Sequence, residues 1–443
     1  MLDLLHLPET APLCHPRARD GSRCLLAGRI IGKNGLAKSK EFIFSKGEVT
    51  MNFDEFINRN QYSTMKWSKS FLAEHFGNED AIPMSVADMD IKAPPAVIKH
   101  LEQRVAHGIY GYEYKPESYF TALTSWYQNR YGWKIDQKEI EPAPSILNAI
   151  SVLISQHSNE GDGVILQTPV FFEFRMVIKS NQRKMVKNPL KFVDGQYQID
   201  FDDLEIKASD PKNKVLILCN PHNPVGRVWT EAELKQIADI CERHSVFVIS
   251  DEIHGDFAFP PHQYIPYLHI SEKAAQNGAA CISPAKTFNI AGMVDAIAVI
   301  PNEKHRHQFH EFAHRYQINK VNVFASIATE AAYQNGAEWL DALLVYIQGN
   351  IDLIRGFLEK NSIGVSLIEP EGTFLVWLDF RELGLNAKEL GVFLAKEAGI
   401  ALSPGYWFGR EGAGFARMTI GCPRERVQEA LDNLDAAIKK RSL

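Results

Sequence analysis

The sequence is poor in cysteine and lacks both long hydrophobic runs and a strong excess of one charge. Its 443 residues include six cysteines and no Cys-x-x-Cys pair, which predicts reduced thiols in a cytoplasmic protein. Apolar runs such as 296–301 fall far short of the roughly 18 to 20 residues of a membrane span, so no membrane partner is expected. The 48 basic residues face 54 acidic ones without a basic block, which argues against nucleic acid as a partner.

Residues 1–50 differ from the rest because they show no sustained hydrophobic period of two or 3.6 residues. We expect an unstructured leader or upstream extension here. The peptide Lys-Gly-Glu-Val-Thr at 46–50 can be encoded by a purine-rich ribosome-binding site at a natural distance from the codon of Met51. We therefore expect translation to start at Met51, and a transit peptide is the alternative interpretation.

Short β-branched runs alternate with helical patterns from residue 51 onward. Four runs are apolar on both faces, which is typical of buried strands, and they cover 163–169, 215–220, 246–251 and 296–301. The helix expected at 230–244 begins with a capping box of Thr230 and Glu233. This alternation predicts an α/β fold, in which a mainly parallel sheet is sandwiched by helices.

The C-terminal part has a different pattern, which predicts a smaller α+β domain. It contains a helix at about 339–359, a strand at 373–379, a capped helix from Asn386 and a last helix from Arg424. We therefore predict four segments, namely the leader at 1–50, a contribution to the small domain at 51–93, a large domain at 94–337 and the small domain at 338–443.

Three polar segments follow three apolar strands, at 220–226, 251–254 and 283–292. Ligands of open α/β sheets bind at the carboxyl ends of the strands, so these segments are candidates for a site. Each is ambiguous alone, because Asp251 could be a helix cap and Lys286 a solvated surface lysine. Together, an asparagine, an aspartate and a lysine, each one strand further along the chain, suit pyridoxal phosphate. The lysine would bind its aldehyde, the aspartate its ring nitrogen and the asparagine its ring oxygen.

Seven motifs resemble fold type I pyridoxal phosphate enzymes of the aminotransferase superfamily, and within them the MalY/PatB-type cystathionine β-lyases. The resemblance covers essentially residues 51–443. The motifs are Val-Ala-Asp-Met-Asp at 86–90, Tyr-Gly-Tyr at 110–112, Thr-Pro-Val at 168–170, Cys-Asn-Pro-His-Asn-Pro-Val-Gly-Arg-Val-Trp at 219–229, Ser-Asp-Glu-Ile-His at 250–254, Lys-Thr-Phe-Asn-Ile-Ala-Gly at 286–292 and Gly-Phe-Ala-Arg at 414–417.

The resemblance implies a role for individual residues of the site. Lys286 would form the Schiff base with the cofactor and later remove the Cα proton of the substrate. Asp251 would pair with the ring nitrogen, and Asn223 would bond the ring hydroxyl with His254 nearby. The remaining implied contacts are Phe171 on the ring face, Arg417 on the substrate carboxylate and Asp88 at the substrate.

The phosphate is expected at the start of an apolar helix, where Ser145, Ile146 and Leu147 would offer free N–H groups. A plain capped helix is the alternative. Ser283 would add a hydroxyl. The resemblance implies that Tyr112, counted among the catalytic residues, reaches the phosphate of the neighbouring subunit, so that a homodimer shares its active sites.

The implied activity is β-elimination from cystathionine or another S-substituted cysteine, giving a thiol, pyruvate and ammonia. Two alternatives stay open, an aminotransferase and a regulatory or binding protein with little turnover. Val294 stands where many aminotransferases carry an arginine, which favours the lyase. His307, His310 and His314 share a helix face, but no carboxylate or thiolate completes a recognisable metal site, so no metal is expected.

Overall fold

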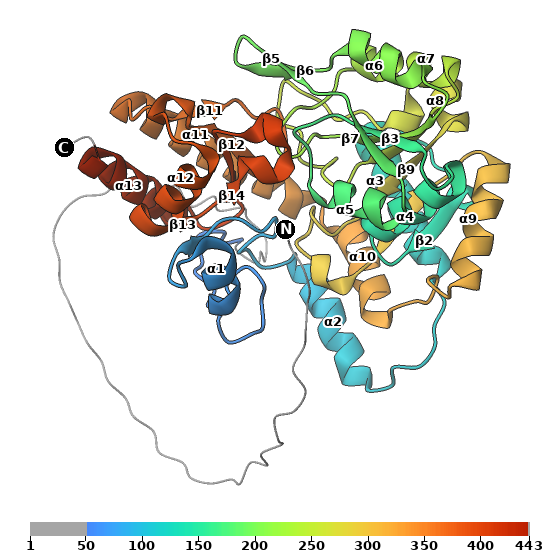
Figure 1. Ribbon diagram of the computed structural model, residues 1–443. Helices are drawn as coiled ribbons and strands as arrows, with labels where there is room; N and C mark the ends of the chain where they lie inside the picture. The colour runs from blue at the N-terminus through green and yellow to red at the C-terminus, as the bar shows by residue number, and fades with distance from the viewer. Residues whose placement is uncertain (1–50, 442–443) are drawn as a thin grey trace, which may run out of the picture. The chain divides into compact units, whose positions relative to one another are not determined.

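The computed structural model describes residues 51–441, and the leader predicted at 1–50 lies outside them. A seven-stranded sheet with the strand order β2-β10-β9-β8-β7-β3-β4 lies in the right-hand part of the described chain in Figure 1. These strands are β2 (Ile140–Ala143), β3 (Gly163–Leu166), β4 (Lys184–Lys187), β7 (Asn213–Cys219), β8 (Phe247–Asp251), β9 (Gly278–Ile282) and β10 (Ala296–Val299). Five neighbours from β9 to β4 run parallel, whereas β10 is antiparallel to both β9 and β2. The predicted mainly parallel sheet is confirmed.

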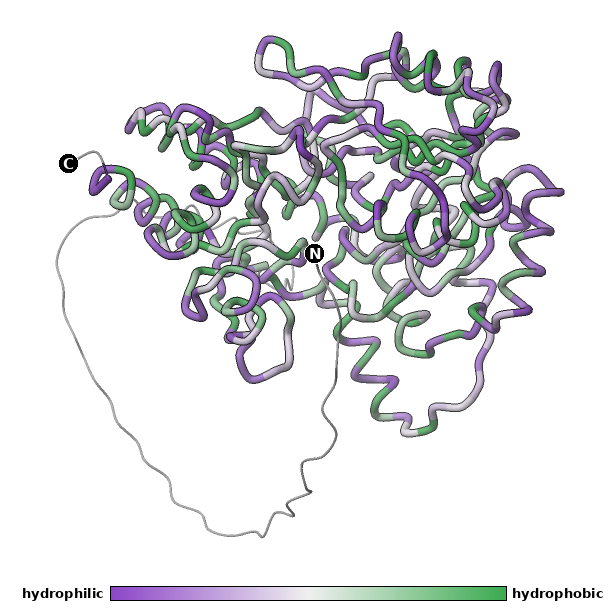
Figure 2. The backbone as a smooth tube through the Cα atoms, viewed as in Figure 1, coloured by the Kyte–Doolittle hydropathy of each residue, from purple (hydrophilic) through white to green (hydrophobic). Residues whose placement is uncertain are grey.

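Alternate residues of the central strands enter two separate hydrophobic cores. Val215 and Ile217 of β7 pack into one core, while Leu216 and Leu218 pack into the other. Side chains of a strand point alternately to the two faces of the sheet, so both faces must be covered by helices. Figure 2 accordingly shows hydrophobic residues gathered in the central strands and mainly hydrophilic residues along the outer helix α9.

Helices cover both faces of this sheet. One core contains residues of α4 (Ile146–His157), α5 (Glu173–Ser180) and α9 (Glu303–Arg315). The other contains residues of α2 (Pro95–His107), α3 (Glu117–Tyr131), α6 (Phe201–Ser209), α7 (Glu231–Arg243), α8 (Glu272–Gln276) and α10 (Val323–Asn335). The capping box expected before α7 is present, because the Thr230 hydroxyl accepts from the Glu233 N–H and the Glu233 carboxylate accepts from the Thr230 N–H.

A second, four-stranded sheet is built from the C-terminal part, with the order β11-β12-β15-β14. Its strands are β11 (Ser366–Ile368), β12 (Leu375–Asp379), β14 (Ser403–Pro404) and β15 (Phe415–Thr419), and its helices are α11 (Ala337–Asn361), α12 (Ala387–Val392) and α13 (Arg424–Arg441). The short strand β1 (Ile82–Pro83), which follows α1 (Lys69–Phe76), pairs with β13 (Ile400–Ala401). A hairpin of β5 (Lys191–Val193) and β6 (Gln196–Gln198) completes the strands. The domain boundaries at 93 and 337 stay a prediction.

Candidate functional site

The three polar segments singled out in the sequence lie next to one another at the carboxyl ends of adjacent strands. β7, β8 and β9 are neighbours, and their residues Cys219, Asp251 and Cys281 are paired in register. Segments 220–226 and 283–292 follow β7 and β9, and 251–254 begins at the last residue of β8. Parallel strands therefore deliver all three segments to one edge of the sheet, where ligands of such sheets bind.

Asp251 is a buried acid, 5% exposed, at the last position of β8. Its Oδ1 accepts one hydrogen bond, from the Ile253 N–H at 3.1 Å, and no ion pair reaches it from residues 51–441. Burial raises the pKa of Asp251 to about 7, against which the Ile253 N–H and the charge of Lys286 act. A buried carboxylate that lacks a counter-ion is costly, so this position suits a cationic ligand.

Lys286 lies in the turn after β9, and its Nζ donates to the Ala87 carbonyl oxygen at 2.6 Å. Burial lowers the pKa of Lys286, and the charge of Arg417 acts in the same direction, although the acids Asp88, Asp251 and Glu173 oppose the change. A lowered pKa leaves a larger fraction of the amine neutral, and the neutral amine is the nucleophilic and basic form.

The residue after Lys286 anchors this turn to Asp256, in the segment after β8, which is held in turn by side chains of α3. The Thr287 hydroxyl donates to Asp256 Oδ2 at 2.6 Å, and Trp126 Nε1 donates to Asp256 Oδ1 at 3.0 Å. The Tyr131 hydroxyl donates to the same carboxylate. Sequence reasoning did not identify Asp256, because its partners are spread over more than 150 residues of the chain.

Arg417 is a buried cation, 2% exposed, in the middle of β15. Its Nη1 donates to Asn223 Oδ1 at 3.0 Å and its Nη2 to the Ser85 carbonyl oxygen at 2.7 Å, while its Nε has no partner among residues 51–441. No carboxylate of that part of the chain pairs with it, and burial lowers its pKa to about 9. A buried guanidinium in this state suits an anionic ligand, which a planar donor binds through two hydrogen bonds.

His254 and Phe171 also lie at this end of the sheet. His254 is buried, and its Nδ1 has no hydrogen-bond partner among the described residues. Burial lowers the pKa of His254 well below its ordinary value, and the charges of Lys286 and Arg417 add to this effect. The ring is therefore neutral at physiological pH. Phe171 follows β3 and is half-buried, with its ring at 5.5 Å from Phe174.

The start of α4 offers N–H groups without acceptors, as the sequence predicts. Ser145 caps this helix, because its Oγ accepts from the Asn148 N–H at 3.2 Å and its carbonyl oxygen accepts from Ala149. The N–H groups of Ile146 and Leu147 donate to no atom of residues 51–441. Free N–H groups at a helix N-terminus bind anions such as phosphate.

Ser283, which is predicted to add a hydroxyl to the phosphate site, makes two hydrogen bonds within the chain. Its hydroxyl donates to the Asp295 carbonyl oxygen at 2.6 Å and accepts from the Ala285 N–H at 3.2 Å. Asp295 in turn accepts from Lys115 Nζ at 2.7 Å. In this arrangement the hydroxyl proton of Ser283 is already engaged, so a contact with phosphate would require that the Ser283 side chain rotates.

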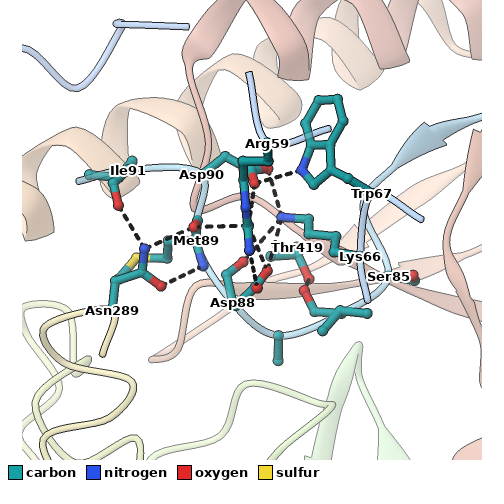
Figure 3. A network of polar contacts seen from close by, with 12 residues as sticks. Arg59, Lys66, Trp67, Ser85, Asp88, Met89, Asp90, Ile91, Asn289 and Thr419 are labelled. Atoms are coloured by element: carbon teal, nitrogen blue, oxygen red, sulfur yellow. Dashed lines mark hydrogen bonds and ion pairs between the residues drawn. The ribbon is translucent and has the colours of Figure 1, made fainter. Parts of the chain in front are cut away.

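An ion-pair network, which sequence reasoning did not predict, surrounds Asp88 and Asp90 (Figure 3). Arg59 Nη2 lies 2.7 Å from Asp88 Oδ2, and its Nη1 lies 2.7 Å from Asp90 Oδ1. Lys66, 1% exposed, places its Nζ at 2.7 Å from Asp90 Oδ2, and Trp67 Nε1 donates to Asp90 Oδ1 at 2.9 Å. The charge of Asp88 is therefore balanced by Arg59 within the chain. The same carboxylate acts to raise the pKa of Lys286.

Asn289 joins the turn of Lys286 to the segment 87–91. Its Oδ1 accepts from the Met89 N–H at 3.0 Å, and its Nδ2 donates to the carbonyl oxygens of Met89 and Ile91 at 2.8 and 2.6 Å (Figure 3). These contacts span about 200 residues of sequence. The amide thereby fixes the distance between Lys286 and Ala87, whose carbonyl oxygen accepts from the lysine.

Two further groups of predicted residues lie away from this edge. Tyr112 is fully exposed in the connection between α2 and α3, where Ile109 and Tyr114 are also exposed. His307, His310 and His314 lie on α9, and no three His, Cys, Asp or Glu side chains within 51–441 are placed to hold a metal ion. Over the same range, every helix is too short or too polar to cross a membrane.

The groups at this edge thus complement one another chemically. They comprise an amine of lowered pKa, an acid without a counter-ion, a guanidinium without a carboxylate, a neutral histidine and two free N–H groups, contributed by Lys286, Asp251, Arg417, His254 and the start of α4. This set fits the aldehyde, ring nitrogen, ring oxygen and phosphate of pyridoxal phosphate together with the carboxylate of an amino acid.

Comparisons with known proteins agree with this geometry. The family described as aminotransferase class I and II matches residues 79–434. Cystathionine beta-lyase PatB of Bacillus subtilis is 39% identical over 88% of this chain and 100% of its own length. Protein MalY of Escherichia coli is 34% identical over 88% of this chain and 99% of its own length.

The structure of cystalysin from Treponema denticola, which contains a pyridoxal 5′-phosphate cofactor, has a TM-score of 0.85 and 33% identity over 89% of this chain and 100% of cystalysin. The structure of the PLP-bound C-S lyase of Staphylococcus hominis has a TM-score of 0.80 and 30% sequence identity. The match covers 88% of this chain and 100% of the lyase. The chain belongs to the aminotransferase class I and II family.

Proposed function

We propose that the protein is a pyridoxal phosphate-dependent carbon-sulfur lyase that cleaves S-substituted cysteines such as cystathionine. The observation that carries this proposal is the pair of buried, uncompensated groups Asp251 and Arg417, whose charges both act on Lys286. A cofactor with a cationic ring and a substrate with a carboxylate would neutralise both. The relatives with the names cystathionine beta-lyase and C-S lyase support the choice of reaction.

Pyridoxal phosphate supplies an aldehyde that captures the substrate amine and a protonated ring that withdraws electrons from Cα. Lys286 would carry the aldehyde carbon between turnovers, and Asp251 would hold the ring nitrogen in its protonated state. Asn223 and the neutral His254 would donate to the ring hydroxyl oxygen, and Phe171 would cover the ring face. The N–H groups of Ile146 and Leu147 would bind the phosphate. The hydroxyls of Ser145 and Ser283 would join them after turning away from Asn148 Oδ1 and the Asp295 carbonyl oxygen, to which they donate in this structure.

Lys286 Nζ is proposed to take the proton from Cα once the substrate amine has displaced it. Burial favours its neutral form, which is the form that accepts a proton. Arg417 would hold the substrate carboxylate, with its Nη1 oriented by Asn223 Oδ1, and Asp88 would lie at the substrate. Overall, the Cα–H and Cβ–S bonds break, the sulfur leaves as a thiolate that takes up a proton, and water converts the remaining enamine to pyruvate and ammonia.

The exposed loop before α3 supports the proposal of a homodimer with shared active sites. Tyr112, Tyr114 and Ile109 are large side chains that stand free of residues 51–441, which is typical of a surface covered by a partner. Tyr112 would reach the phosphate bound by the other subunit. A cytoplasmic location is proposed from the small number of cysteines.

Product analysis of the Lys286→Ala variant tests the proposed function. The wild-type protein is expected to release a thiol and pyruvate from cystathionine, and Lys286→Ala is expected to release neither and to lose the visible absorbance of the bound cofactor. The matched control is Lys360→Ala, which removes a lysine of the last turn of α11 and should leave both signals unchanged. Pyruvate formation by Lys286→Ala would contradict the assignment.

The same assay separates the lyase from the aminotransferase. An aminotransferase would convert cystathionine to its keto acid in proportion to an added amino-group acceptor and would release no thiol. Failure to form either product with cofactor bound would favour a regulatory or binding protein.

A further inference from the structure

A cavity of about 520 Å³ lies beside Phe171, between the ends of β3 and β4 and the 405–410 loop, whose first four residues form the 3₁₀ helix Gly405–Phe408. Its volume is within the roughly 300 to 1,000 Å³ of small-molecule sites. Aromatic side chains line it from two segments, the one after β3 and the one before β15, and they are Phe171, Phe172, Tyr406, Trp407 and Phe408. The cavity therefore lies between the large sheet and the segment that leads into β15.

The cavity adjoins the residues of the proposed active site. Phe408 lines it and lies under the guanidinium of Arg417, with the Arg417 Cζ at 4.9 Å from the ring centre. The Val170 N–H donates to the Phe408 carbonyl oxygen at 3.0 Å, which fixes the loop against the end of β3. A substrate whose carboxylate contacts Arg417 therefore has this cavity within reach of its side chain.

Three cations line the cavity, and two of them have no acidic partner. Lys187 is paired with Glu411, with the Nζ at 3.0 Å from Oε1. Arg175 of α5 and Arg410 of the loop form no ion pair and no side-chain hydrogen bond with residues 51–441. One exposed arginine is normally solvated, but these two come from separate parts of the chain and line the same aromatic cavity.

We propose that this cavity binds the departing half of the substrate and that Arg175 and Arg410 bind a carboxylate on that half. The substrate class is therefore cysteine thioethers whose leaving thiol carries an acid, as in cystathionine, in preference to simple S-alkyl cysteines. This inference rests on the proposed function and adds the specificity of the same site. Aromatic walls suit the methylene chain, and guanidinium groups suit the terminal carboxylate.

A pair of isosteric substrates isolates the charge. S-(2-carboxyethyl)-L-cysteine and its amide differ only in the distal group, so the ratio of their kcat/KM values measures recognition of the carboxylate. The wild-type ratio is expected to favour the acid by about 10-fold or more. Arg175→Gln and Arg410→Gln should each lower kcat/KM for the acid by about 10-fold and change that for the amide by less than about twofold, since one charge-assisted hydrogen bond corresponds to roughly this factor.

Arg315→Gln is the matched control, because Arg315 is an exposed arginine of α9 outside the cavity. It should leave both kcat/KM values unchanged. Equal values for acid and amide in the wild-type protein, or equal losses for both substrates in the cavity variants, would overturn the proposal.

Calorimetry with 3-(methylthio)propanoate gives a readout that needs no turnover, because this acid has no amine to react. The holoenzyme should bind it, and the Arg175→Gln, Arg410→Gln double variant should bind it about 10-fold or more weakly. Equal affinities would overturn the proposal. If the wild-type protein cleaved neither thioether, the proposed function would fail, whereas the calorimetric result would still decide whether the cavity binds a carboxylate.

Discussion

Replacing Asp251 with asparagine is expected to stabilise the cofactor-free protein, although the residue belongs to the proposed site. Burial raises the pKa of Asp251 to about 7 in the folded protein, from an ordinary value of 3.8. The folded state therefore binds more protons than the unfolded chain between about pH 4 and about pH 7. The stability that protonated Asp251 contributes is fully present below about pH 4 and is lost as the pH rises through about 7.

Asparagine has the shape of the protonated acid and does not titrate, so the benefit of Asp251→Asn grows with pH. With the two pKa values above, the gain in unfolding free energy is about 2 kcal/mol larger at about pH 8 than at about pH 5.5. Urea unfolding followed by tryptophan fluorescence, at one fixed protein concentration, measures this difference. Addition of pyridoxal phosphate should reverse the order, because only the carboxylate can pair with a cationic ring.

Asp90 provides the matched control, since it is 6% exposed and Asp251 is 5% exposed. Although burial acts to raise the pKa of Asp90, its ion pairs with Lys66 and Arg59 hold that pKa below the ordinary value. Its contribution to stability is therefore present above the ordinary pKa and is lost as the pH falls through the lowered one. Asp90→Asn leaves Lys66 buried without its strongest partner and should destabilise the protein by about 3 to 5 kcal/mol at neutral pH.

An Asp251→Asn protein that is less stable than the wild type without cofactor would refute this reasoning. So would a stability difference that is the same at both pH values, because it would show that the carboxylate is not held in its neutral form by burial.

Three further predictions concern the site and its supports. Arg417→Lys should lower kcat/KM for cystathionine by roughly 100-fold, because lysine cannot replace a planar donor that bonds Asn223, Ser85 and a carboxylate together. Steady-state kinetics measures this ratio, and an unchanged kcat/KM would contradict the prediction. Asn289→Ala removes three hydrogen bonds to Met89 and Ile91 and should lower the unfolding free energy by about 1 to 3 kcal/mol, measured by urea unfolding; an unchanged midpoint would exclude a structural role for the amide. Tyr112→Ala and Lys286→Ala should each be inactive alone and recover roughly a quarter of wild-type activity when their subunits are exchanged, and mixtures without activity would exclude shared sites.

The sequence was sufficient to predict the elements of the fold where local patterns determine them. The capping box at Thr230 and the runs at 215–220 and 246–251 depend on neighbours within a few residues, and the structure places α7, β7 and β8 there. The antiparallel direction of β10 was not predicted. Strand direction depends on the path of the connecting chain, and an apolar run of four residues looks the same in either direction.

The chemical types of the candidate site residues could also be predicted from the sequence, because Asn223, Asp251 and Lys286 each come at or after the end of an apolar run. The sequence does not show how the pKa values of these groups are shifted. Asp251 and Arg417 are buried without an ion-pair partner, and this burial depends on how the two sheets pack.

Contacts between distant segments could be found only in the folded protein. Arg417 and Asn223 are 194 residues apart, and Arg59 and Asp90 meet without any recognisable spacing. The cavity with Arg175 and Arg410 forms only where the end of β3 meets the loop before β15. Hydrophobic period and turn chemistry act over a few residues, so the pattern of amino acids was enough to predict the main strands and helices and the kinds of reactive groups. The distances between those groups follow from how the long connections fold over the sheets, and so only the three-dimensional structure decided the charge balance and the shape of the site.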